Sequence, residues 1–249
     1  MEWKIRYIDE TDSTNRWLKS RLTADAGGAA DHFSSELGTR AVVVADYQTA
    51  GRGCGTNRWE SERGQNLLFS MLIHPTDLPA NRQFRVSMAI ANSIAKVLSS
   101  YVGQVSIKWP NDIYVGDRKI CGILIENSLQ GSVISDSIIG VGLNVNQLRF
   151  VSDAPNPVSL ANLTGRLLDR EQLLQQLLEA FDAECADLEG VRSRYLPQLY
   201  RRTGFHRYRD ALSEFSAELL TVEDDGHLLL RNTDGHDLRY AFKEVQFVI

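Results

Sequence analysis

Four short polar clusters in the sequence lie beside apolar segments, and their side chains suit the binding of a small charged molecule. Hydroxyl and amide groups can hydrogen-bond a neutral polar ligand, arginine and lysine can offset the charge of an anion, and amide or carboxylate oxygens can hold a hard cation. The clusters are Asp12-Ser13-Thr14-Asn15, Gln48 with Gly51-Arg52-Gly53 and Arg58, Lys108-Trp109-Pro110-Asn111-Asp112 with Lys119, and Gly140-Val141-Gly142-Leu143-Asn144.

This inventory suits activation of a carboxylate by a nucleotide. Two anions must meet in such a reaction, which needs fixed cations and usually Mg²⁺, and a mobile loop must then shield the reactive product from water. Other chemistries have less support, because the sequence contains no GxxxxGK[ST] phosphate loop, no dinucleotide fingerprint, no GxSxG nucleophile elbow and no HExxH helix. The five histidines are scattered, which gives little support to a His-based nucleophile pair.

The segment from Asp46 to Arg63 is central to this arrangement. Apolar strands are predicted on both sides of it, at 41–45 and 67–73, and the segment itself contains glycines, arginines and a tryptophan but little that can form a core. Glycine lets backbone N–H groups approach a ligand closely, and a long loop inside a compact domain is usually functional or disordered. We therefore expect a mobile, anion-handling loop on a sheet scaffold, with an ordinary surface loop as the alternative.

Apolar periodicity predicts the elements that position these clusters. Spacings of three and four residues predict amphipathic helices over 81–102 and from Asp169 to Leu188, with a shorter helix over 191–202. Short strands joined by tight turns predict an antiparallel or mixed sheet. Besides the two strands that flank the central loop, they are expected at 3–8, 105–108, 113–115, 119–126 and 133–145.

The C-terminal region differs in character from the rest of the chain. It is rich in short strands, and the turn signals Asp225-Gly226 and Asp234-Gly235 predict successive hairpins. About 45 residues of short strands suggest a small barrel appended to an α/β core. We therefore expect one domain at 1–202 and a small β domain at 203–249.

Composition sets limits on the class of protein. The chain has 249 residues, 43% of them apolar and 24% charged, with a net charge of −5, all ordinary for a globular protein. The acidic balance argues against binding nucleic acid by general charge. No secretory signal or membrane-spanning run is recognised, and the three cysteines have no zinc or disulfide spacing, so we expect a cytoplasmic protein with free thiols and no membrane association.

The order of the motifs resembles that of biotin protein ligases. STN, then GRGxxxxxW, then KWPND with a following KxxGIL, then GxGLNVN occur in that order over roughly residues 10 to 146. The pair KWPNDIYV and KICGILIE is the most specific part. The C-terminal strand-rich region fits the small C-terminal domain of that family.

The resemblance implies a fold and an activity. The fold is α+β, a class II synthetase-like mixed sheet flanked by helices, with a small C-terminal SH3-like β-barrel. The activity has two half-reactions: biotin and ATP give biotinyl-5′-AMP and pyrophosphate, and a lysine of a biotin carboxyl carrier protein then attacks the mixed anhydride. ATP, Mg²⁺ and biotin are the expected small molecules.

The resemblance also implies site roles. The residues expected to line the biotin pocket are Ser13, Thr14, Asn15, Gln48, Gly51, Arg52, Gly53, Cys54, Lys119 and Gly122. The residues expected to carry the chemistry are Arg52, Lys119, Lys108 and Asp112. The nucleotide is expected to meet Arg52, Arg58, Trp59, Lys108, Asn111 and Asn144, and Mg²⁺ to meet Asp112 and Asn144.

Simpler interpretations exist for some of these residues. The STN triplet is also the sequence of an ordinary helix N-cap, and both roles can hold together. The loop departs from the family's usual GRGRxGRxW, because this chain reads GRGCGTNRW. Two guanidinium groups are therefore missing from the tip, at Cys54 and Asn57, although Arg58 is retained. We expect the loop to close less tightly and biotinyl-AMP to escape faster than in arginine-rich relatives.

Three other functions compete with this interpretation. A lipoate or octanoate ligase or transferase shares the core fold but lacks the KWPND…KxxGIL pairing. A biotin-responsive DNA-binding repressor needs a winged helix before Ser13, where twelve residues stand, so we expect no DNA binding. A non-catalytic biotin or nucleotide binder is disfavoured by the retained arginine and lysines. The oligomeric state is left open between monomer and homodimer.

Overall fold

The computed structural model describes residues 2–24, 40–55, 57–151 and 156–249. The chain divides into two compact units. Unit 1 comprises Met1–Ala80 and Arg118–Leu178, and unit 2 comprises Asn81–Asp117 and Glu179–Ile249. Each unit contains both helices and strands, so the fold class is α+β, as the sequence predicts.

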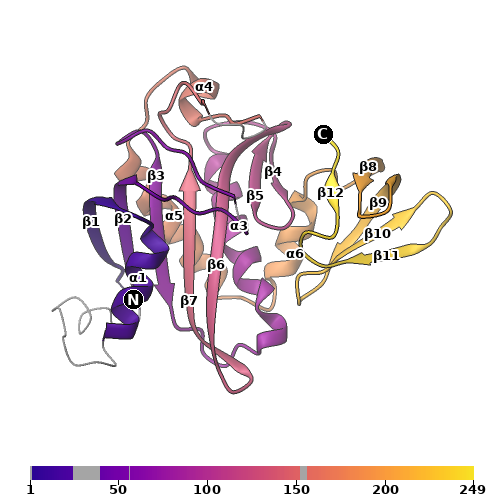
Figure 1. Cartoon of the computed structure of the whole chain (residues 1–249), viewed down its shortest axis with the longest axis horizontal. Helices are drawn as coiled ribbons and strands as arrows, with labels where there is room; N and C mark the ends of the chain where they lie inside the picture. Colours follow the sequence, from indigo (N-terminus) through magenta and orange to yellow (C-terminus); the bar gives the residue numbers. More distant parts are fainter. Residues whose placement is uncertain (1, 25–39, 56, 152–155) are drawn as a thin grey trace. The chain divides into compact units, whose positions relative to one another are not determined.

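Unit 1 is built on a mixed sheet (Figure 1). Its five strands lie in the order β1-β2-β3-β7-β6, and β1 and β2 are parallel whereas the other neighbours are antiparallel. The expected mixed sheet is thereby confirmed. The bounds of the strands are Lys4–Thr11 for β1, Arg40–Gln48 for β2, Leu67–Ile73 for β3, Arg118–Gln130 for β6 and Val133–Leu143 for β7.

The middle strands of this sheet are buried on both faces. All seven residues of β3 are buried, and β2 is buried from Ala41 to Ala45. β-branched residues such as Val42 and Val43 fit a pleated surface that is covered on each side. One polar residue, Ser70, lies within the otherwise apolar β3 and is fully buried, so it requires a hydrogen-bond partner.

Helices cover the sheet of unit 1. Helix α1 (Thr14–Ala24) places Leu18 in a buried cluster with Val43, Leu72 and Ile138, which belong to three different strands. Figure 1 shows α1 lying across this face of the sheet. The contact fixes the N-terminal turn of α1 above β3 and β7, where the first polar cluster of the sequence begins.

Two further helices follow the sheet along the chain. Helix α4 (Leu160–Thr164) begins with a capping box between Ser159 and Asn162. Helix α5 (Arg170–Cys185) buries Leu173, Leu174, Leu177, Leu178 and Phe181, spaced as one face of a helix. Its start agrees with the sequence prediction, because the carboxylate of Asp169 accepts from the amides of Glu171 and Gln172 at 2.8 and 3.1 Å.

Unit 2 contains the predicted long helix and the strands of the C-terminal region. Helix α3 (Phe84–Leu98) follows a short 3-10 turn, η1 (Ala80–Arg82), and is shorter at both ends than the predicted 81–102. A hairpin of β4 (Val105–Lys108) and β5 (Asp112–Val115) follows it. The predicted helix over 191–202 is divided into α6 (Val191–Tyr195) and the 3-10 turn η2 (Leu196–Gln198).

The C-terminal strands form a five-stranded antiparallel sheet in the order β11-β10-β9-β8-β12. Gly226 and Gly235 lie in the turns that join β9 to β10 and β10 to β11, with φ angles of +95° and +83°, which glycine adopts without strain. The predicted hairpins are therefore present, but the described strand pairs leave β11 and β12 as edges and record no closure into a barrel. The strands are β8 (Phe205–Arg209), β9 (Glu214–Val222), β10 (Leu228–Asn232), β11 (Asp237–Tyr240) and β12 (Gln246–Phe247).

Candidate functional site

The first turn of α1 is held by a side chain from β2. The amide nitrogen and the hydroxyl of Thr14 donate to Gln48 Oε1 at 2.8 and 3.1 Å. The first amides of a helix have no partner within the helix, so Gln48 satisfies a donor that is otherwise unpaired. The hydroxyl oxygen of Ser70 in turn lies 2.7 Å from Thr14 Oγ1. The structure thus brings Thr14 and Gln48, 34 residues apart in sequence, into one hydrogen-bonded group.

Asn15 extends this group across the sheet. Its Oδ1 accepts from Ser70 Oγ at 2.6 Å, and its Nδ2 donates to Glu126 Oε2 at 2.9 Å and to the carbonyl of Leu124 at 3.2 Å. Asn15 lies directly on Gly140, where an added Cβ would lie 2.2 Å from Oδ1. Only glycine leaves room for the amide at this position.

The carboxylate of Glu126 also contacts the central loop. Arg52 Nη1 donates to both oxygens of Glu126, at 3.2 and 3.1 Å, and the two side chains are 35% and 23% exposed. The ammonium of Lys19 lies 3.9 Å from the same carboxylate. Glu126 therefore joins the start of α1 to the arginine of the loop. A sequence-predicted pocket residue and a sequence-predicted catalytic residue share this one partner.

The central loop contains more regular structure than its sequence suggests. The amide of Trp59 donates to the carbonyl of Gly51 at 3.0 Å, and the amide of Gly53 donates to the carbonyl of Asn57 at 2.8 Å. These bonds, with a β-bridge between Arg52 and Arg58, make residues 51–59 a small hairpin. Its tip contains Cys54, which is partly exposed, and Gly55, which has a φ of +69°. Thr56 lies outside the described residues.

Both ends of the hairpin are fastened to the unit. On one side the amides of Thr49 and Ala50 donate to the carbonyls of Thr11 and Asp12. On the other side the buried Asn66 donates to Gln147 Oε1 at 2.6 Å, and its Oδ1 accepts from the amide of Val145 at 2.9 Å. Further hydrogen bonds at this end come from Ser61, Glu62 and Arg170. The hairpin is thus the segment between two anchored ends.

Trp59 lies on a patch of the sheet that has no side chains. Gly122 in β6 and Gly142 in β7 are register partners, and an added Cβ would lie 3.0 and 2.4 Å from the indole at these two positions. The ammonium of Lys119 lies 5.7 Å from the centre of the indole ring, within the range of a cation–π contact. The indole Nε1 is buried and has no hydrogen-bond partner among the described residues.

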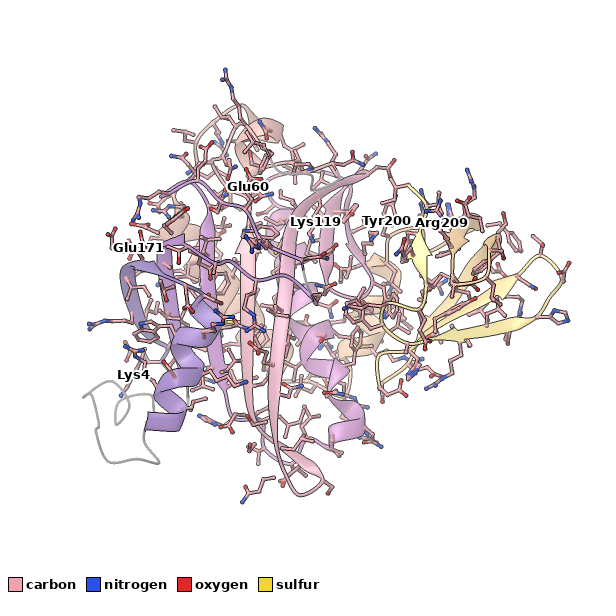
Figure 2. All side chains as sticks on the ribbon, viewed as in Figure 1. Lys4, Glu60, Lys119, Glu171, Tyr200 and Arg209 are labelled. Carbon is pink, nitrogen blue, oxygen red and sulfur yellow. The ribbon has the colours of Figure 1, made fainter. Side chains whose placement is uncertain are left out.

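A small cavity of about 50 Å³ lies beside this indole. Asn144 is 3% exposed, its Nδ2 donates to the carbonyl of Val158 at 3.1 Å, and its Oδ1 accepts no hydrogen bond within the described part of the chain. A buried acceptor without a donor is costly, so this oxygen is suited to a ligand donor or a cation. Glu60 and Lys119, two of the residues that line the cavity, are labelled in Figure 2. The cavity is lined by Arg58, Trp59, Glu60, Lys119, Asn144, Phe150 and Pro157.

The third sequence cluster belongs to unit 2. Lys108 and Asp112 face each other as the last register pair of the β4–β5 hairpin. The ammonium of Lys108 lies 5.3 Å from the ring centre of Tyr114 and 5.1 Å from that of Phe247. Burial, followed by the negative charge of Asp112, raises the pKa of Tyr114, which keeps the phenol neutral. The Lys108 cation therefore lies against two uncharged aromatic rings.

Trp109 has a structural role within unit 2. Its side chain is 2% exposed, and its Nε1 donates to the carbonyl of Gly226 at 2.9 Å. Gly226 also lies against Phe84, since an added Cβ would lie 2.8 Å from the ring. The tryptophan of the KWPND motif thus holds the turn between β9 and β10. Asn111 lies beside it in the turn of the β4–β5 hairpin.

Sequence reasoning missed Ser70 and Glu126. Ser70 carries a usable signal, because a polar residue in the all-apolar stretch LLFSMLI must find a partner. Glu126 has no such signal, because a charged residue near the exposed end of a strand is ordinary. Ser13, next to Thr14 in the sequence, is 3% exposed.

One cluster among the described residues has the spacing of a metal site, and it does not contain the predicted metal ligands Asp112 and Asn144. It consists of Glu223, Asp225 and His227 in unit 2. Both carboxylates already contact Arg239, at 2.7 and 2.6 Å, which supplies the positive charge. Within the described ranges no helix is both long and apolar enough to cross a bilayer.

Comparison with known proteins places these features in a family. Residues 9–144 match the model of the biotin/lipoate A/B protein ligase family. The bifunctional ligase/repressor BirA of Bacillus subtilis is 30% identical over 205 residues, which cover 78% of this chain and 62% of that protein. The biotin–[acetyl-CoA-carboxylase] ligase of Paracoccus denitrificans is 27% identical over 243 residues, covering 93% of this chain and 95% of that protein.

Solved structures have the same fold. The biotin protein ligase from Aquifex aeolicus in complex with biotin and ATP superposes with a TM-score of 0.76 at 21% identity, covering 98% of this chain and 99% of that chain. The chain matches 56–62% of the length of the bifunctional BirA relatives. It therefore spans less than two thirds of the length of these relatives.

Proposed function

The chain belongs to the biotin/lipoate A/B protein ligase family, and from this we propose that it activates biotin with ATP to biotinyl-5′-AMP and transfers biotin to a lysine of a biotin carboxyl carrier protein. The observation that carries the proposal is the hydrogen-bonded group that runs from Gln48 through Thr14, Ser70 and Asn15 and ends at Arg52 through Glu126. It combines donors and acceptors for a neutral polar ring with a cation for a carboxylate.

Biotin has both kinds of group. Its ureido ring carries N–H donors and a carbonyl acceptor, which Ser13, Thr14, Asn15 and Gln48 can match. Its carboxylate requires a cation, and Arg52, which shares Glu126 with this group, can supply it. Gly51, Gly53, Cys54 and Gly122 are proposed to complete the pocket. Trp59 lies over Gly51 and Gly122 and Asn57 lies over Gly53, so a ligand reaches these glycines only when the hairpin moves.

In the first half-reaction the carboxylate oxygen of biotin attacks the α-phosphorus of ATP, and pyrophosphate leaves. Arg52 and Lys119 are proposed to hold the carboxylate and the phosphate together and to stabilise the charge that develops between them. In the second half-reaction a carrier lysine attacks the acyl carbon and AMP leaves. The hairpin is proposed to exclude water from the anhydride between the two steps.

The nucleotide is proposed to use the cavity beside Trp59. Arg58 can meet a phosphate, Trp59 can stack on the base, and Asn144 Oδ1 can accept from an amino group. Lys108 and Asn111 of unit 2 are proposed as further nucleotide contacts. Because the cavity is much smaller than a nucleotide, binding requires the hairpin to move.

Mg²⁺ is proposed to accompany ATP and to neutralise phosphate charge. Mg²⁺ prefers oxygen ligands and is usually held by one or two carboxylates together with substrate phosphates. Asp112 would supply the carboxylate, and the buried oxygen of Asn144 fits a cation as well as it fits a donor.

The partner and the setting of the reaction are also proposals. The named relatives include ligases for acetyl-CoA carboxylase, which supports a carboxylase carrier domain as the protein substrate. We propose that the protein acts in the cytoplasm as a monomer or homodimer, without binding DNA. We also propose that 203–249 forms a small domain of its own beside 1–202, which limited proteolysis at the junction can test.

Biotin-dependent exchange of labelled pyrophosphate into ATP tests the activity. The proposal predicts exchange with biotin and Mg²⁺ and none with lipoate or octanoate in place of biotin. Exchange with lipoate in place of biotin would instead favour a lipoate ligase. Binding of biotin with no exchange would indicate a non-catalytic binder.

A further inference from the structure

We propose that Glu126 is a positioning residue that aims Arg52 at the ligand anion. The inference rests on the proposed biotin-dependent function and concerns the same site. Its basis is the contact of both Glu126 oxygens with a single nitrogen of Arg52, at 3.2 and 3.1 Å.

The guanidinium is engaged at one end only. A guanidinium has five N–H donors in a planar fork, and this one uses Nη1 for Glu126. Among the described residues no acceptor is recorded for its Nε or Nη2. The rest of the fork therefore remains available to an anion such as the biotin carboxylate or the adenylate phosphate.

The two partners lie on elements with different backbone pairing. Glu126 lies in the long strand β6, which is paired with β7 from Cys121 to Gln130. Arg52 lies in the hairpin 51–59, which is held between two anchored ends. An arginine on such a loop samples many rotamers, and a carboxylate fixed to the sheet restricts it before the ligand arrives. Pre-organisation of this kind favours binding without a direct contact to the ligand.

Glu126 fixes a second pocket residue at the same time. Its Oε2 also accepts from Asn15 Nδ2 at 2.9 Å, and Asn15 is held on its other side by Ser70. One carboxylate therefore sets the geometry between the start of α1 and the loop arginine. The two groups are expected to meet opposite ends of biotin.

Glu126→Gln tests the proposal in the whole protein. The variant keeps the shape and one acceptor oxygen but removes the charge that strengthens the bond to Arg52. We expect the biotin KM in pyrophosphate exchange, and the biotin Kd measured by calorimetry without ATP, to rise roughly tenfold. Glu126→Asp, which keeps the charge, is expected to recover part of the affinity.

The control is Glu10→Gln. Glu10 pairs with Arg63 at the other end of the same loop, outside the proposed pocket, so its biotin KM is expected to stay within about twofold of wild type. Thermal unfolding of every variant distinguishes a loss of folding from a loss of Arg52 positioning.

The double variant Arg52→Ala/Glu126→Gln tests whether Glu126 affects biotin binding through Arg52. If Glu126 acts through Arg52, its substitution in the Arg52→Ala background changes the biotin Kd by less than about twofold, because the oxygen that glutamine keeps can still accept from Asn15. A full effect in that background, or a biotin affinity in Glu126→Gln equal to or higher than wild type, overturns the proposal. Failure of wild type to exchange or to bind biotin is a different result and counts against the proposed function itself.

Discussion

Alanine at Gly140 and alanine at Gly142 are expected to damage the protein in different ways, although both glycines lie on the same face of β7. At Gly140 the new Cβ would lie 2.2 Å from Asn15 Oδ1, and at Gly142 it would lie 2.4 Å from the indole of Trp59. Asn15 is 2% exposed and is held by three hydrogen bonds. Trp59 belongs to the hairpin, and its Nε1 has no partner in the described part of the chain.

The magnitude for Gly140→Ala follows from these contacts. Asn15 must retreat by about 1 Å to reach an ordinary contact distance, which breaks its bonds to Ser70 and Glu126. Overpacking costs about 1–3 kcal/mol and two buried hydrogen bonds add about 1 kcal/mol each, while alanine regains about 0.5–1 kcal/mol over glycine in a strand. The expected loss in the free energy of unfolding is about 2–4 kcal/mol, with a weaker affinity for biotin.

Gly142→Ala is expected to lower the free energy of unfolding by less than about 1 kcal/mol, because the hairpin can lift the indole off the sheet. The lost contact should instead speed the release of biotinyl-AMP. Urea unfolding followed by circular dichroism, together with adenylate release from a preformed complex, separates the two variants. Equal destabilisation by both substitutions, or a Gly140→Ala protein as stable as wild type, would refute the reasoning.

Three further substitutions give separate tests. Cys54→Arg restores a guanidinium to the hairpin tip and should slow the release of biotinyl-AMP; equal release rates would contradict the role given to the tip. Trp109→Phe removes the bond to the Gly226 carbonyl and should cost about 1–3 kcal/mol in urea unfolding, whereas unchanged stability would show that the bond is dispensable. Burial raises the pKa of Asp12, but hydrogen bonds from Arg16 and a backbone amide outweigh it, so the folded pKa lies below the unfolded one. Wild type should therefore lose stability as the pH falls through that lowered pKa, and Asp12→Asn should lose less between about pH 5 and about pH 2; parallel pH profiles would contradict this.

The elements with strong local signals could be predicted from the sequence. Helix α5 begins where Asp169 offers a cap, and the hairpins after β9 and β10 have Asp-Gly turns. Local chemistry determines such features, because a cap or a positive φ involves residues only a few positions apart. The helix predicted over 81–102 was too long because its ends lack side-chain caps that the sequence could have indicated.

The sequence predicts a mobile, anion-handling loop between β2 and β3, and it gives no sign of the backbone pairing that joins 51–53 to 57–59. This pairing consists of backbone bonds such as the one from Trp59 to Gly51, which involve no particular side chain. Backbone pairing in a glycine-rich segment leaves little trace in the pattern of apolar residues.

The partners within the site were the least predictable part. Thr14, Asn15 and Arg52 were named from the sequence, but the groups that hold them lie 34 to 111 residues away along the chain. Such contacts depend on the order of strands in the sheet, which brings β3, β6 and β7 together under α1. Ser70 could have been selected as a buried polar residue, but Glu126 required the structure.

The most direct test of the central claim is transfer of biotin to a carboxylase carrier domain, followed by mass spectrometry of the carrier. With biotin and Mg·ATP the wild-type protein is expected to label one lysine of the carrier, and a carrier with arginine at that position is expected to remain unlabelled. Lys119→Ala is expected to reduce labelling severely while leaving the protein folded. A carrier that stays unmodified with wild type, or that accepts lipoate in place of biotin, would contradict the account.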